Sequence, residues 1–247
     1  MSLLRDIQVS LLDENANIGP VLLKLRFLAD RLGSDILEDW VKHETEGYEA
    51  SSGLPSYRQT TITYTGTFSN GYQTLNDVSI APSLIVKHAN KEWVQYGIRD
   101  PLPVIEKLTM NSSSEGGFSV DTGNLKLLIQ DKIYDNGMVC LELTSRIDIG
   151  AFAQILTDVR AKLLDFTLEI EKKVPVSKLI TVDVSAEVSS TDIANVAQIT
   201  HNVFNGPVGS IASIGSPSNV DVEVNFGTVG VTVNVLAFNM CIHHRPT

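Results

Sequence analysis

The side chains best suited to chemistry near the start of the chain are His43, Glu44 and Glu46. A zinc-binding helix of the His-Glu-x-x-His type needs two imidazoles one turn apart. No second His follows His43 at that spacing. We therefore predict that these three side chains belong to an exposed, charged helix face and not to a metal or acid–base site.

The remaining histidines and acids also lack a catalytic pattern. His201 stands alone, and the adjacent His243 and His244 would point to opposite faces of a strand. Glu169 and Glu171 are two positions apart on a predicted helix, so they face different directions and form no dyad. Four further acids would build a metal-dependent nuclease site only if the fold brought them together: Asp131, Asp135, Glu142 and Asp148.

Motifs for nucleophilic catalysis and for phosphate binding are absent from the sequence. It contains no Gly-x-Ser-x-Gly elbow, no Walker loop and no Gly-x-Gly-x-x-Gly fingerprint. Residues 206–210 are rich in glycine, but they include Pro207 and no Lys follows them. The sequence thus predicts no catalytic residue, no metal site and no cofactor.

Acidic residues outnumber basic ones in this chain of 247 residues, 29 against 19, which gives a formal net charge of −10. Such a chain repels a phosphate backbone at long range, so we expect no general nucleic-acid binding. The cysteines Cys140 and Cys241 form no Cys-x-x-Cys pair, which fits a reducing compartment, and Cys140 is expected to be buried. Because the sequence also shows no signal peptide and no apolar membrane-spanning run, we expect a cytoplasmic protein.

The elements that must position these side chains begin with three short helices in residues 1–50. Apolar residues recur at helical spacing over residues 3–12 and 18–32, and Gly33 is suited to end the second helix. Ser34 is expected to cap a third helix that ends at Gly47.

Strand patterns follow, and then one long helix. Residues 60–65, 93–98 and 139–143 are rich in β-branched and aromatic side chains, with turn chemistry at Asn70-Gly71 and Asn76-Asp77 and a solvated loop at 111–117. Residues 150–173 keep a helical period until Pro175 stops it. We expect a core that contains Leu25, Leu28, Trp40, Val159, Leu163 and Phe166.

Charged residues become scarce after Pro175: residues 174–247 hold only seven of them. We place a domain boundary at 174–176 on this change of composition. Residues 181–188, 220–226 and 229–235 alternate between apolar and polar side chains, as strands do. The predicted fold is therefore α+β: an N-terminal helical unit on a mixed β-sheet closed by a long helix (1–173), followed by an all-β C-terminal domain (174–247).

The alternating strands allow two interpretations. They can form an ordinary sandwich or a sheet on the first domain, or they can pair between protomers to give a ring or a filament. In the second case the apolar rows are a candidate oligomer interface: Val182, Val184, Val220, Val222, Val224, Phe226, Val229, Val231 and Val233. Membrane contact is expected only if the assembly forms a pore.

A string of motifs in the first domain carries a family resemblance. Residues 22–29, 40–44, 47–48 and 54–58 together resemble the N-terminal signature of the AbiTii family of bacterial abortive-infection proteins. Residues 159–160 and 164–171 are similar to the family's closing segment, so the resemblance covers roughly residues 2–173. It implies antiphage defence by a toxin-like protein, with an antitoxin or a phage-derived trigger as candidate partners, but it brings no catalytic motif.

The motif residues themselves are interpreted as structural. Trp40 and Tyr48 are expected to pack the helical unit, and Pro55 to stiffen the exit from it. Arg58 is expected to bridge a carboxylate or to cap carbonyl groups of the preceding helix. The favoured function is non-enzymatic defence through homo-oligomeric assembly of the C-terminal domain. The alternative is a toxin enzyme, such as a metal-dependent nuclease whose ligands converge only in the fold.

Overall fold

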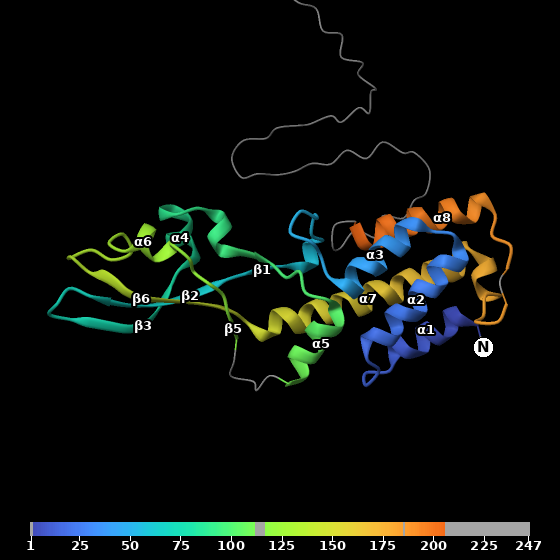
Figure 1. Cartoon of the computed structure of the whole chain (residues 1–247), viewed down its shortest axis with the longest axis horizontal. Helices are drawn as coiled ribbons and strands as arrows, with labels where there is room; N and C mark the ends of the chain where they lie inside the picture. Colours follow the sequence, from blue (N-terminus) through green and yellow to red (C-terminus); the bar gives the residue numbers. More distant parts are fainter. Residues whose placement is uncertain (1, 112–116, 185, 206–247) are drawn as a thin grey trace, which may run out of the picture. The chain divides into compact units, whose positions relative to one another are not determined.

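The first three helices begin and end where the sequence predicts. In the computed structural model, which describes residues 2–111, 117–184 and 186–205, they are α1 (Leu3–Leu12), α2 (Ile18–Leu32) and α3 (Asp35–Glu46) (Figure 1). Gly33 ends α2 in the left-handed region with φ 63°, where glycine carries no steric penalty. Ser34 precedes α3 as expected, but its side chain accepts no capping hydrogen bond.

The strands form two antiparallel sheets. In the four-stranded sheet the order is β3-β2-β6-β5, with β2 (Thr63–Ser69), β3 (Thr74–Ile80), β5 (Phe118–Ser119) and β6 (Val139–Ile147). The second sheet pairs β1 (Gln59–Thr61) with β4 (Gln95–Gly97). The predicted strand 60–65 is therefore split at Ile62 between two sheets, and the predicted strand 93–98 keeps only three paired residues.

The two turn signals in this region have different outcomes. Asn70-Gly71 turns the chain between β2 and β3, where Asn70 Oδ1 accepts hydrogen bonds from the backbone of Tyr72 and Gln73. Asn76-Asp77 instead lies inside β3 as a bulge, because the register shifts between the Gly66–Val78 and Phe68–Leu75 pairs. Asp77 adopts a positive φ of 52° in this bulge, which is why the pair Asn76-Asp77 has the residue types of a turn.

Several helices pack against the long helix α7 (Ile149–Lys173), which Asp148 caps by accepting a hydrogen bond from the Gly150 N–H. Helices α1, α5 and α8 all contact α7, and α2 contacts α3 and α5. The other helical segments are α4 (Pro82–His88), α5 (Leu102–Asn111), α6 (Leu125–Ile129), α8 (Ser190–Thr200) and the short turns η1 (Ser56–Arg58), η2 (Lys91–Val94), η3 (Pro175–Lys178) and η4 (His201–Asn205).

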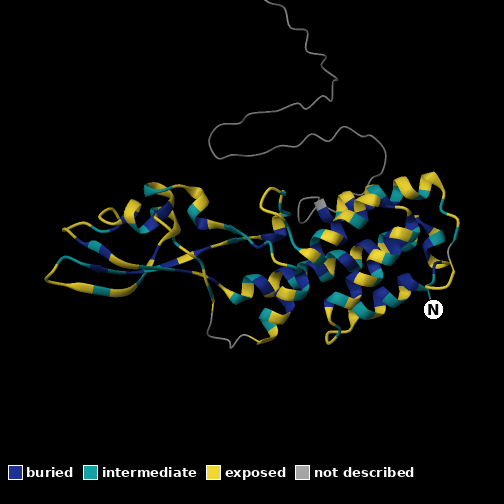
Figure 2. Ribbon diagram, viewed as in Figure 1, coloured by how far each residue is buried: buried dark blue, intermediate teal, exposed yellow. Residues whose placement is uncertain are grey.

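Much of the core lies between these helices, and it continues onto the four-stranded sheet through residues such as Tyr64, Phe68 and Cys140 (Figure 2). The predicted core is confirmed, since none of its six side chains is more than 7% exposed: Leu25, Leu28, Trp40, Val159, Leu163 and Phe166. Cys140 is buried as predicted. The predicted α+β class and the long closing helix are confirmed as well.

The prediction of an all-β segment after residue 174 is wrong for the part that the structure describes. Residues 181–184 form a turn in which the Thr181 N–H donates to the Val184 carbonyl at 3.1 Å, and no strand is present in 181–184 or 186–188. Helix α8 follows, capped by Ser189, which accepts from the Asp192 N–H. Its buried residues Val196, Ile199 and Thr200 recur at helical spacing, and α8 contacts α3 and α7.

The described residues all belong to one compact unit, Met1–Gly209. Residues after Pro175 share hydrogen bonds with the first helix, because the Leu3 N–H donates to the Ile180 carbonyl at 3.0 Å. The described chain thus continues across 174–176 into elements that pack on the same core. The predicted strands 220–226 and 229–235 lie outside the described residues.

Candidate functional site

Glu44, predicted to lie on an exposed face, is fully buried. It sits one helical turn after Trp40 on the inward face of α3, while Glu46 points outward and is exposed. A carboxylate can be buried at this position because Arg58 supplies the opposite charge from η1. The sequence prediction failed because the partner lies in a different element, fourteen positions along the chain.

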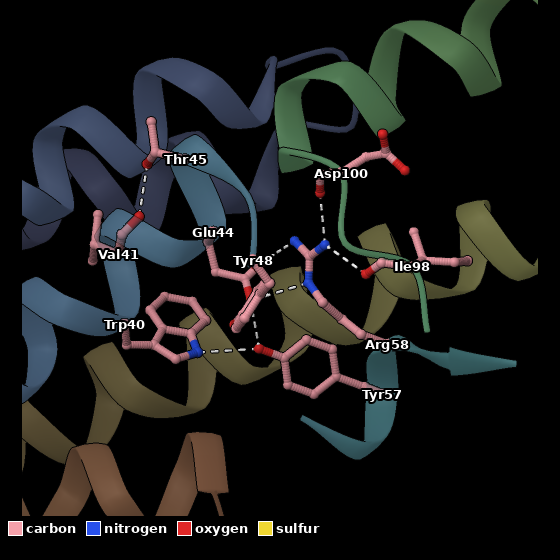
Figure 3. A network of polar contacts seen from close by, with 9 residues as sticks. All are labelled: Trp40, Val41, Glu44, Thr45, Tyr48, Tyr57, Arg58, Ile98 and Asp100. Atoms are coloured by element: carbon pink, nitrogen blue, oxygen red, sulfur yellow. Dashed lines mark hydrogen bonds and ion pairs between the residues drawn. The ribbon is translucent and has the colours of Figure 1, made fainter. Parts of the chain in front are cut away.

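Arg58 holds this carboxylate in a two-point contact (Figure 3). Its Nη2 donates to Glu44 Oε2 at 2.5 Å and its Nε to Oε1 at 3.3 Å. The remaining nitrogen, Nη1, donates to the carbonyl groups of Ile98 at 3.2 Å and Asp100 at 2.7 Å. The prediction that Arg58 bridges a carboxylate is confirmed, and the same side chain also satisfies backbone carbonyls that follow β4.

Two tyrosines and one tryptophan complete the network. The hydroxyl groups of Tyr48 and Tyr57 each donate to Glu44 Oε1 at 2.7 Å, and Trp40 Nε1 donates to the Tyr57 hydroxyl at 3.1 Å. Burial, reinforced by the Glu44 charge, raises the pKa of both tyrosines well above the ordinary range. Both hydroxyls therefore stay protonated, and the network acts as a fixed structural joint.

A second buried carboxylate, Glu106 on α5, has a comparable role that sequence reasoning missed. Its two oxygens accept from the Ile18 N–H at 2.9 and 3.1 Å, so it caps the start of α2 from outside that helix. Arg160 on α7 pairs with Glu106 at 3.5 Å and also donates to the Ala16 carbonyl. No local pattern marks Glu106, because the helix end that it caps is far away in sequence.

A groove of about 900 Å³ lies beside the Glu44–Arg58 network. We name it the α3 groove; its lining comes from α3, the following loop and the end of α8: Ile36, Asp39, Trp40, His43, Tyr48, Ser52, Gly53, Leu54, Pro55, Ser56, Thr200 and Phe204. Aromatic contacts build its wall: Trp40 stacks on Phe204 at 3.8 Å between ring centroids, and His43 stacks on Tyr48 at 5.1 Å. The groove therefore offers an aromatic, weakly charged surface.

Two of the predicted interface residues lie on a different surface. Val182 and Val184 are 65% and 55% exposed, and the neighbouring Leu179 is 65% exposed. The Val184 N–H donates to the Thr181 hydroxyl at 3.0 Å, which closes the loop that presents these side chains. We name residues 179–184 the 179–184 turn. The other predicted interface residues lie outside the described part of the chain: Val220, Val222, Val224, Phe226, Val229, Val231 and Val233.

The scattered acids do not converge. Within residues 2–111, 117–184 and 186–205, no group of three His, Cys, Asp or Glu side chains is placed to hold a metal ion. Glu169 pairs with Lys172 and Lys173, whereas Glu171 accepts from Gln8 and pairs with Lys178. The prediction that these two acids face different directions is thus confirmed.

Within the described residues, no helix combines the length and the apolar composition that crossing a bilayer requires.

Comparison with protein families places the chain in a known family. The family model described as AbiTii matches residues 2–195, which includes Glu44, Arg58, Glu106, Arg160 and most of α8. No curated protein and no solved structure matches the chain.

Proposed function

Because the chain belongs to the AbiTii family of abortive-infection proteins, we propose that it defends against phage by homo-oligomeric assembly and not by catalysis. The assembly uses residues 174–247. An infected cell is arrested when the assembled form appears.

The observation that carries this proposal is the exposed apolar 179–184 turn. Leu179, Val182 and Val184 each leave more than half of their surface in water, and they lie within six residues of each other. Neighbouring apolar side chains exposed in this way are typical of surfaces that are covered by another chain. The turn lies in residues 174–247, the segment in which charged residues are scarce.

The buried carboxylates also support a mechanism without acid–base chemistry. Glu44 accepts four hydrogen bonds from side chains, and Glu106 caps a helix. Since structural partners occupy both groups, neither is available to move a proton to or from a substrate.

The apolar rows predicted in 220–226 and 229–235 extend the same proposal. Seven of the nine predicted interface residues belong to them, and we propose that they pair between protomers. A pore is the way in which such an assembly would contact a membrane. An antitoxin or a phage component would act as the trigger.

The experiment is to measure the mass of the purified full-length chain by light scattering and native mass spectrometry. The proposal expects a defined oligomer that degrades neither RNA nor DNA in the presence of Mg²⁺ or Mn²⁺. Release of dye from anionic liposomes would add the membrane step. A monomer with metal-dependent nuclease activity would overturn the proposal in favour of a nuclease toxin.

A further inference from the structure

We propose that the 179–184 turn of one copy inserts into the α3 groove of a second copy, so that the contact runs head to tail. This inference rests on the proposed assembly and names the two surfaces that meet in it. Both surfaces belong to the described chain. In the contacts described above, no apolar side chain covers the turn or fills the groove.

Both surfaces carry apolar side chains, and the groove has room for those of the turn. The turn presents three aliphatic side chains, Leu179, Val182 and Val184, closed into a loop by the hydrogen bonds of Thr181. The α3 groove is concave and is lined by Ile36, Trp40, Leu54, Pro55 and Phe204 among others. Its volume of about 900 Å³ lies in the range that accepts a drug-sized apolar group. A second copy of the turn is thus an occupant of suitable size and chemistry.

The charges around the two surfaces are also compatible. In the turn, Asp183 is exposed, and Lys178 precedes the turn with half of its side chain in water. Along the groove lies the exposed carboxylate of Asp39. Lys178 opposite Asp39 would place a pair of unlike charges at the rim.

The symmetry of such a contact follows from the use of two different surfaces. An isologous dimer joins one patch to itself, whereas a turn that enters a groove joins unlike patches. In the head-to-tail form each copy keeps one free turn and one free groove, so the contact continues until a ring closes or a filament grows. Two copies that insert their turns reciprocally across a two-fold axis would instead form a closed dimer, and the mass of the assembly distinguishes the two arrangements.

Disulfide cross-linking of two separate variants tests the contact. Both carry Cys241→Ser and keep Cys140, which is buried and whose pKa burial raises. One adds Val182→Cys in the turn, and the other adds Gly53→Cys in the groove. At Gly53 a Cβ would meet no atom within 4 Å, so this substitution is tolerated. The two chains carry tags of different mass, are mixed at equal concentration and are oxidised with copper phenanthroline.

The matched control replaces Gly53→Cys by Val9→Cys on α1, a 46% exposed position outside the groove lining. We expect the mixed disulfide between Val182→Cys and Gly53→Cys to form at least about tenfold faster than the control pair, because a disulfide requires Cα atoms about 4.4–6.8 Å apart. Circular dichroism confirms that each variant is folded before mixing.

The outcomes separate this inference from the proposed function. If the unmodified chain is oligomeric but both pairs cross-link equally slowly, the turn and the groove do not meet, and the assembly uses another surface. If the unmodified chain is monomeric at micromolar concentration, the proposed assembly fails and this contact fails with it. Selective cross-linking between Val182→Cys and Gly53→Cys supports the turn–groove contact and the proposed assembly.

Discussion

The carboxylate of Glu44 and the guanidinium of Arg58 meet inside the protein with neither side chain exposed to solvent. Because Arg58 also donates to the Ile98 and Asp100 carbonyls, one residue ties α3 to the end of the small β1–β4 sheet at which β1 begins and β4 ends. Arg58 directly precedes β1, and Ile98 directly follows β4. The ion pair thus fixes where the chain leaves the helices and where it returns.

Replacing Arg58 tests the importance of this joint. Arg58→Met removes the countercharge and leaves Glu44 buried, which we expect to lower the free energy of unfolding by about 3–5 kcal/mol. Urea denaturation followed by circular dichroism measures the loss. Glu46→Gln is the control on the same helix. The ion pair between Glu46 and Arg26 is long, at 3.9 Å, and both side chains are about half exposed. The expected cost of Glu46→Gln is below about 1 kcal/mol. Equal losses in the two variants would contradict the structural role of the pair.

Local signals in the sequence were sufficient where the fold is decided locally. The boundaries of α2 and α3 follow from apolar spacing and from Gly33 and Gly47, and the length of α7 follows from its period and Pro175. Such elements are set by residues within one or two turns of each other. The structure therefore matches the prediction there to within a residue.

Long-range contacts decide the parts that the sequence did not predict. The burial of Glu44 depends on Arg58, and the role of Glu106 depends on the distant start of α2. Residues 181–188 alternate like a strand, but alternation produces a strand only when another strand pairs with it. Here two hydrogen bonds close a turn instead. The Thr181 N–H donates to the Val184 carbonyl, and the Thr181 hydroxyl accepts from the Val184 N–H. Val182 and Val184 therefore remain exposed.

Trp40 is expected to be the most costly aromatic side chain to remove from the helical core. It is 7% exposed, it stacks on Phe204 and it donates a hydrogen bond to Tyr57. Trp40→Ala should lower the free energy of unfolding by about 3–5 kcal/mol. Tyr72→Ala is the control, because Tyr72 is 100% exposed and its loss should be within about 0.5 kcal/mol. A loss below about 1 kcal/mol for Trp40→Ala would show that the stack contributes little to the core.

The end of α7 should give a small stability change that depends on pH. The hydrogen bond from Lys173, at 2.8 Å, holds the pKa of Glu169 below its usual range. Because the pKa is lower in the folded protein than in the unfolded chain, the pair stabilises the fold above the unfolded pKa of about 4.3. That stabilisation is lost as the pH falls through the folded pKa.

Lys173→Met should therefore lower the free energy of unfolding slightly at neutral pH, by less than about 1 kcal/mol because the pair is partly exposed. A lower urea midpoint measures this loss. The difference from the unmodified chain should disappear at about pH 2, where Glu169 is protonated in both states. Lys172→Met serves as the comparison, since its ammonium lies 3.9 Å from Glu169. A deficit of equal size at both pH values would mean that Lys173 stabilises α7 by other contacts.

The last prediction concerns where the chain can be shortened without loss of its fold. Removal of residues 174–247 would strip five buried apolar side chains from the core of the described chain: Val174, Ile180, Val196, Ile199 and Phe204. Each such side chain contributes about 1.5–3 kcal/mol of burial, so the sum approaches the whole stability of a domain. A chain that ends at Lys173 should therefore unfold or aggregate. The chain that ends at Asn205 keeps all five and should unfold cooperatively at a temperature close to that of the full chain.

This difference makes the chain that ends at Asn205 the informative truncation for function. It retains the 179–184 turn and the α3 groove but lacks the apolar rows predicted in 220–235, so we expect smaller assemblies and loss of phage protection. Calorimetry establishes that it is folded, native mass spectrometry gives its assembly state, and plaque counts on cells that express it measure protection. Full protection by a folded, monomeric chain of this length would place the activity within residues 1–205 and would exclude assembly through the C-terminal rows.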